Sequence, residues 1–363
     1  MDKDLKYPLL FRASAFFIGM FALISMLYIG HGIIVPLIFA TILAIVLHPA
    51  VVLLQRLKMN RVLAITITLI LTIIIIIAFG SFLISQIVRF SDSWPAMVEK
   101  FTGYFDEIIT WASGYFDISP QKILEWIAKT KGELINSSGT AIGHTLVNVG
   151  NGLVVILLIP VYIFMILFYQ PILLEFLRRL FGADNRSQVS TIITEIKSVI
   201  QRYLTGLAIE AILVAILDTA ALLLLGIEYA VLLGIIGALL NVIPYIGGLI
   251  AVALPMIIAL ITKNSPWYPI YVMAAYYFIQ LIDNNYIVPK IVASKVKINA
   301  LVSIVAVLAF GALWGIPGMF ISIPLTAIVK LIFDHIEPLK PWGFLLGDSM
   351  PDIAIFKLKL KKK

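Results

Sequence analysis

The sequence predicts an all-α polytopic membrane protein, and three observations support this prediction. Of the 363 residues, 61% are hydrophobic and only 13% are charged, which leaves too few polar groups to cover a water-soluble domain. The hydrophobic residues gather in runs that are long enough to cross a bilayer. Short clusters of lysine and arginine lie beside these runs, so the net charge of +7 indicates orientation in a lipid bilayer and no nucleic-acid partner.

The apolar runs predict six full spans and two broken, re-entrant segments. The two broken segments, 230–261 and 300–333, are each interrupted near the centre by glycine and proline. The six full spans cover residues 13–29, 33–54, 62–87, 152–169, 204–225 and 267–287.

The first broken segment contains Asn241-Val-Ile-Pro244-Tyr-Ile-Gly247-Gly248 at its centre. An unbroken helix over 232–260 would be about 43 Å long, well beyond the roughly 30 Å hydrocarbon core. Pro244 lacks an N–H group and the paired glycines free the backbone, so nearby amides and carbonyls lose their helical partners. Such breaks are tolerated where protein or a water-filled cavity satisfies these groups, and they are typical of transporter binding sites. The alternative is a proline kink or a simple turn between two spans.

The second broken segment contains Trp314-Gly315-Ile-Pro317-Gly318, and the flanking charges favour hairpins for both segments. The connector 55–61 has three basic residues and no acidic one, whereas 89–147 has five basic and seven acidic residues. The positive-inside rule then places the N-terminus in the cytoplasm. If both segments crossed the membrane once, the lysines of 288–299 would face outward; if both are hairpins, one entering from outside and the other from inside, these lysines face the cytoplasm, which fits the charges better.

This threading divides the chain into four parts. Residues 1–87 hold three N-terminal spans, and 88–147 form an extracytoplasmic amphipathic helical region. Residues 148–333 form a transport core with the two broken segments, and 334–363 form a basic cytoplasmic tail. The aromatic face of the second part is expected to pack on the membrane surface, on the transmembrane core or on another subunit.

Two acidic residues, Glu210 and Asp218, lie inside the fifth span, each about 6 Å from its centre. A charge near the bilayer centre costs roughly 2.5–3.5 kcal/mol on insertion scales, so both should face protein or water. Their spacing places them about 80° apart on the helix, near enough to border one cavity. They are candidates for carrying a proton or a sodium ion. Alternatively, they are hydrogen-bonded packing groups, or Glu210 lies at the membrane interface.

Further polar candidates are Asp283, Asn284 and Asn285 at the end of the sixth span, and Asn241 beside the first break. Their oxygen and amide groups could coordinate a cation or hydrogen-bond a polyhydroxylated solute. They could equally cap the helix end or bond the backbone that the breaks set free. The residues of the breaks are expected to shape the site without choosing its ligand; they are Pro244, Gly247, Gly248, Gly315, Pro317 and Gly318.

Three ordered motifs resemble the autoinducer-2 exporter (AI-2E) family of transporters. They are Gly226-Ile-Glu-Tyr-Ala-Val-Leu-Leu-Gly234 leading into Leu240-Asn-Val-Ile-Pro-Tyr-Ile-Gly-Gly248, then Asp283-Asn-Asn-Tyr-Ile-Val-Pro289, and finally Gly311-Ala-Leu-Trp-Gly-Ile-Pro-Gly-Met-Phe-Ile-Ser-Ile-Pro324. The resemblance implies a multi-pass, homo-oligomeric protein of the bacterial inner membrane. It also implies either export of autoinducer-2 or sodium(lithium)/proton antiport. The chain departs from the family pattern at Leu207, where many members have glutamine, and this weakens the transfer of a polar solute contact to that span.

No enzyme signature competes with transport. The sequence has no H-E-x-x-H motif, P-loop, G-x-S-x-G elbow or cysteine, and its four histidines are too scattered for a metal site. We therefore expect no catalytic residue and no cofactor beyond a coupling Na⁺ or H⁺. The sequence predicts a secondary transporter or exporter of a small solute, with the lipid bilayer and other copies of the chain as partners. A sodium(lithium)/proton antiporter and a non-transporting membrane scaffold are the alternatives.

Overall fold

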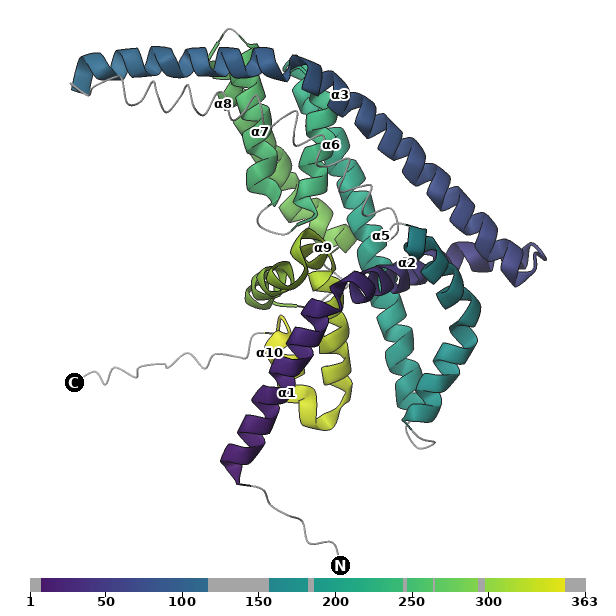
Figure 1. Ribbon diagram of the computed structural model, residues 1–363. Coiled ribbons are helices and arrows are strands. Elements are labelled where there is room, and N and C mark those ends of the chain that lie inside the picture. The colour runs from purple at the N-terminus through teal and green to yellow at the C-terminus, as the bar shows by residue number, and fades with distance from the viewer. Residues whose placement is uncertain are drawn as a thin grey trace, which may run out of the picture.

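The computed structural model describes residues 8–116, 157–181, 186–243, 247–263, 265–292 and 298–349, and these residues are almost entirely helical (Figure 1). The only β pairing in these ranges is an isolated bridge between Ile298 and Gly347. Five of the described helices are long and apolar enough to cross a membrane: His31–Arg56, Arg61–Gly103, Leu157–Leu180, Arg186–Leu224 and Ala300–His335. The predicted all-α polytopic membrane protein is confirmed.

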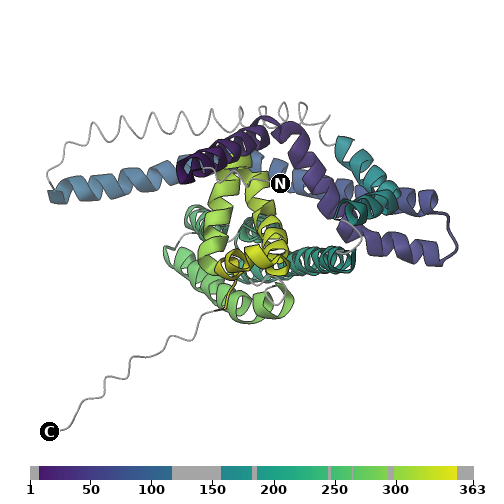
Figure 2. The ribbon, with the colours of Figure 1, turned by 90° about the horizontal axis from the view of Figure 1, so that it is seen from below.

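The N-terminal helices form a group of their own. They are α1 (Leu9–Ile29), α2 (His31–Arg56), α3 (Arg61–Phe116) and the helix Leu157–Leu180. Alanines on facing helices, Ala40, Ala44 and Ala64, pack with Ile65 and Leu167 in a shared apolar cluster. Figure 2 shows α1, α2 and the Leu157–Leu180 helix on one side of the group formed by α5 to α9.

Helix α3 does not end at residue 87, the predicted end of the third span, but continues to Phe116 over 56 residues. It bends where it passes the ends of α6 to α8, and its last part projects beyond them (Figure 1). The Tyr229 hydroxyl donates a hydrogen bond to Ser93 Oγ at 2.6 Å, and Met97 is buried in a cluster with Leu233 and Ile258. This part of the amphipathic region therefore packs on the transmembrane core; residues 117–147 lie outside the described ranges.

The first broken segment is a helical hairpin. Helix α6 (Ala230–Asn241) ends at the break and α7 (Gly247–Thr262) runs back beside it (Figure 1). By helical rise the two arms are about 18 and 24 Å long, so each is shorter than the hydrocarbon core. A Cβ atom on Gly247 would overlap the carbonyl group of Leu240, so glycine is needed where the arms separate.

The second broken segment, α9 (Ala300–His335), also reverses direction. Gly315 has a left-handed backbone conformation, with φ 65° and ψ −148°, and a Cβ atom on Gly318 would overlap the Phe310 carbonyl. Val242 and Ile243 at the end of α6 pack in the same apolar cluster as Met319 of α9. The tips of the two hairpins therefore border one apolar cluster, which α5 and η1 help to form.

The other elements complete the core. Helix α5 (Arg186–Leu224) packs on both hairpins, and α8 (Trp267–Ile282) continues into a π-helical segment, η1 (Asp283–Val292). After α9 the chain forms a short 3₁₀ turn, η3 (Glu337–Leu339), and α10 (Lys340–Leu346), which packs back on α9.

The turn of the second hairpin is anchored to α1, because Trp314 Nε1 donates a hydrogen bond to the Leu27 carbonyl at 3.0 Å. Replacing Trp314 with phenylalanine removes this bond while keeping an aromatic ring. We expect a loss of about 1 kcal/mol, which lowers the melting temperature of the purified protein by about 2 °C. Trp267→Phe is the matched control, since the Trp267 side chain is largely exposed. Equal melting temperatures for the two variants would contradict the anchoring role.

Candidate functional site

A cavity of about 690 Å³ lies between α5, the α6–α7 hairpin, α8, η1 and α9. It brings together six of the residues singled out in the sequence, from four separate elements. They are Glu210, Asp218, Asn241, Gly248, Asp283 and Asn284.

Helix α5 presents one face to this cavity. Tyr203, Leu207, Glu210, Val214 and Asp218 follow one another at steps of three or four residues, which keeps them on the same side of the helix. Only 6% of Glu210 and 3% of Asp218 is exposed, so neither carboxylate lies at the outer surface. The expectation that the two acids border one cavity agrees with this geometry.

Asp218 faces Gly237 of α6. A Cβ atom at position 237 would lie 3.1 Å from Asp218 Oδ2 and 3.7 Å from the Tyr276 hydroxyl. The Asp218 carboxylate and the Tyr276 hydroxyl therefore both lie against α6 at this glycine. The Tyr276 hydroxyl is buried and has no hydrogen-bond partner among the described residues. A buried hydroxyl normally has a partner, so this group is available to water or to a ligand in the cavity.

Asp283 connects the first break to the end of α8. Asn241 Nδ2 donates a hydrogen bond to Asp283 Oδ2 at 2.9 Å, which joins the last residue of α6 to the first residue of η1. Asp283 is 1% exposed, and within the described ranges its Oδ1 atom accepts no hydrogen bond. Such an oxygen can accept a proton, bind a water molecule or contact a ligand.

Amide side chains gather around the first turn of α7. Gln280 Nε2 lies 3.4 Å from Asn284 Oδ1, at the outer limit of a hydrogen bond. A Cβ atom on Gly248 would lie 3.4 Å from Gln280 Oε1 and 3.6 Å from Asn241 Oδ1. The three amides offer donors and acceptors at the same place, a combination that suits hydroxyl groups or a cation.

The π-helical segment η1 packs closely on α5. A Cβ atom on Gly206 would lie only 2.5 Å from the Ile291 carbonyl oxygen, so a larger residue there would push the two elements apart. π-Helical segments are rare and are often found at functional sites, and this one spans ten residues. In this one, Asp283 and Asn284 line the cavity, whereas Asn285 is exposed and donates its side-chain N–H to the Leu281 carbonyl at 2.8 Å.

Four further residues singled out in the sequence are not among the described residues that line the cavity. Gly247 closes the first hairpin, and the second hairpin turns at its own glycines and proline. These residues are Gly247, Gly315, Pro317 and Gly318. Pro244 lies outside the described ranges.

Several polar lining residues were not anticipated. Gln280 and Tyr276 stand about one and two turns before Asn284, so a polar stripe along the sixth span could have revealed both. Tyr203 and Ser303 also line the cavity. Ser303 carries no such signal, because only the packing of α9 against α5 brings it there.

The three carboxylates are spread along the cavity. Within the part of the chain that the structure describes, no three histidine, aspartate or glutamate residues are close enough to hold a metal ion together. The arrangement suits a solute that contacts the wall at several points, or carboxylates that act at separate positions. A single carboxylate with amide neighbours, as at Asp283, could also hold a monovalent cation.

Comparisons with known proteins identify the same family as the three sequence motifs. The sequence model of the family described as "AI-2E family transporter" matches residues 15–337 of this chain. The chain is 24% identical over 319 residues to the "AI-2 transport protein TqsA" of Escherichia coli K12, covering 87% of this chain and 90% of that protein. It is 27% identical over 332 residues to the "Putative permease PerM" of the same strain, covering 88% and 92%. It is 23% identical over 310 residues to the "Putative transport protein YueF" of Bacillus subtilis 168, covering 83% of each. The chain belongs to the AI-2E family of membrane transporters.

Proposed function

We propose that this protein is a secondary exporter that binds a small polar solute in the cavity between α5, the α6–α7 hairpin and η1. The observation that supports this most strongly is the gathering of three buried carboxylates and three amides around one cavity of about 690 Å³. Charged groups inside a membrane protein are costly and generally mark a substrate or ion pathway. The volume suits a small organic molecule with several hydroxyl groups, such as a furanone-type signal.

The two hairpins provide the geometry for alternating access. In our proposal they enter the membrane from opposite sides, so movement of each hairpin exposes the cavity to one side in turn. The N- and C-termini lie in the cytoplasm, the protein resides in the bacterial inner membrane, and several copies assemble into a homo-oligomer. The sequence has no ATP-binding motif, so movement of the solute is coupled to an ion gradient or follows the gradient of the solute itself.

Sodium(lithium)/proton antiport is the second candidate, and Asp283 is the observation that favours it. This carboxylate is almost fully buried, holds Asn241 through one oxygen and leaves the other oxygen without a partner among the described residues. A carboxylate of this kind can exchange a proton for a cation.

Flux in proteoliposomes distinguishes the two candidates. Purified protein is tested for efflux of a labelled furanone-type signal and, separately, for a proton movement driven by sodium. We expect Asp218→Asn to lower solute efflux by about tenfold, which corresponds to the loss of one charge-assisted hydrogen bond. Glu228→Gln is the matched control, because Glu228 is an exposed acid outside the cavity.

Each outcome of this assay has a clear meaning. Solute efflux that falls in Asp218→Asn but not in Glu228→Gln supports the exporter. A sodium-dependent proton signal without solute efflux favours antiport and contradicts the exporter. If flux falls in neither variant, Asp218 is not part of the transport site.

A further inference from the structure

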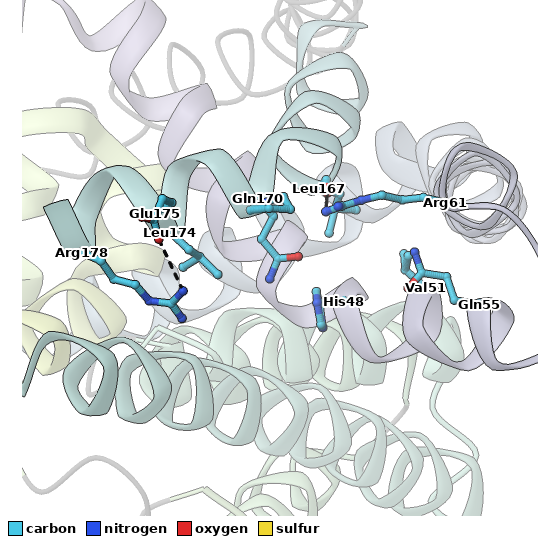
Figure 3. A pocket seen from close by; sticks show the side chains of 10 residues that line it. His48, Val51, Gln55, Arg61, Leu167, Gln170, Leu174, Glu175 and Arg178 are labelled. Atoms are coloured by element: carbon cyan, nitrogen blue, oxygen red, sulfur yellow. Dashed lines mark hydrogen bonds and ion pairs between the residues drawn. The ribbon is translucent and has the colours of Figure 1, made fainter. Parts of the chain in front are cut away.

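A second cavity, of about 540 Å³, lies among α2, the start of α3 and the helix Leu157–Leu180 (Figure 3). It shares no lining residue with the cavity that contains the carboxylates. Its wall is rich in hydrogen-bond donors, which come from all three helices. The polar residues that line it are His48, Gln55, Arg61, Gln170, Glu175 and Arg178.

Two arginines approach this cavity from opposite sides (Figure 3). Arg61 Nη2 donates a hydrogen bond to the Leu167 carbonyl at 2.6 Å, which fixes the guanidinium group and leaves its other N–H groups free to bind a ligand. Arg178 lies 3.9 Å from Glu175, and Glu175 also accepts a hydrogen bond from Arg179 at 2.9 Å. Among the described residues of the wall, Glu175 is the only acid and is already shared between two arginines, so this part of the wall carries a net positive charge.

His48 adds a further donor. Lys197 Nζ lies 3.2 Å from His48 Nδ1, and an ammonium group can only donate, so Nδ1 must accept and the ring proton resides on Nε2. Figure 3 shows the Gln170 amide beside this imidazole. The wall therefore combines two guanidinium groups, amide N–H groups and an imidazole N–H, with the Lys197 charge behind them. This donor set matches an oxyanion, and a phosphate group most closely.

The surfaces beside the cavity are apolar and exposed. At the end of α2, Leu53 is 61% exposed, and Leu57, directly after the helix, is 68% exposed; on the Leu157–Leu180 helix, Ile172 is 63% and Phe176 is 58% exposed. A cationic cavity between membrane-spanning helices, with lipid-facing side chains next to it, fits an anionic headgroup whose acyl chains lie along the helices. We propose that this cavity binds a phosphate-bearing anion, and that the phosphate belongs to the headgroup of an anionic phospholipid.

Lipid retention by the purified full-length protein tests this proposal. Native mass spectrometry in detergent compares bound phosphatidylglycerol with bound phosphatidylcholine, because both carry a phosphate but only the first has a net negative charge. We expect the protein to retain phosphatidylglycerol in preference, and Arg178→Gln to lower this retention by about fivefold. Arg179→Gln is the matched control: it removes the same charge one residue away, from a side chain that is 74% exposed and does not line the cavity.

A second measurement uses the unaltered protein. Retention of phosphatidylglycerol should fall as sodium chloride is raised, since salt screens the attraction, while retention of phosphatidylcholine should change little. Equal retention of the two lipids, or equal losses in Arg178→Gln and Arg179→Gln, would overturn the proposal. If inorganic phosphate displaces the lipid when both are present at the same concentration, the cavity still binds phosphate, but the assignment of that phosphate to a lipid headgroup is overturned.

Discussion

Replacing Asp283 with alanine is expected to reduce transport by about a hundredfold. The substitution removes a carboxylate from the cavity and leaves the Asn241 amide without its partner, and the two losses together cost about 3 kcal/mol. The initial rate of flux in proteoliposomes measures the effect. If solute efflux is the activity, the rate of efflux falls; if antiport is the activity, the sodium-driven proton movement falls.

Two further variants separate charge from shape at this position. Asp283→Asn keeps the size of the side chain and removes the charge, so a rate equal to wild type would show that the charge is not needed. Asn285→Ala is the control, because Asn285 lies on the same π-helical segment but is not among the residues that line the cavity. A loss of activity in Asn285→Ala as large as that in Asp283→Ala would mean that the segment matters for folding alone.

The second large effect is expected at the turn of the first hairpin, where Gly247→Ala should disturb both stability and transport. A Cβ atom there would overlap the Leu240 carbonyl, so the two arms must separate. Overpacking of this kind costs about 1–3 kcal/mol, which lowers the melting temperature by about 5 °C. Because the arms carry Asn241 and Gly248, their separation also displaces two residues of the cavity wall.

The neighbouring glycine provides the control for this prediction. Gly248→Ala adds the same methyl group, but its nearest neighbour would be Gln280 Oε1 at an ordinary contact distance of 3.4 Å. We expect Gly248→Ala to keep the melting temperature of the wild type and to alter only the fit of the solute. If Gly247→Ala and Gly248→Ala had the same melting temperature, the turn at Gly247 would not be tight enough to require glycine.

The sequence was sufficient to predict the helical membrane fold and the position of both breaks. Apolar runs and the glycine–proline pairs are local features, and the structure places α6, α7 and the Gly315 turn where these features indicated. Glu210 and Asp218 were recognised because charge is expensive in a bilayer, whatever the surrounding fold.

The remaining features depend on contacts between distant parts of the chain. The pairing of Asn241 with Asp283 joins residues 42 positions apart, and no local pattern distinguishes it from two helix caps. The extension of α3 to Phe116 was also missed, since the change from apolar to amphipathic composition near residue 87 resembles the end of a span. Tertiary packing, here of Met97 against Leu233 and Ile258, allows the helix to continue.

The apolar cluster beside the two hairpins bears on how the proposed transporter would move. Val242 and Ile243 after α6 and Met319 of α9 all pack on this cluster, so a motion of either hairpin must change the packing there. Exposing one such side chain to water costs about 1.5–3 kcal/mol, and every 1.4 kcal/mol slows a step about tenfold. In the proposed transport cycle, this apolar packing therefore contributes to the barrier to hairpin movement, in addition to the contacts between the solute and the cavity wall.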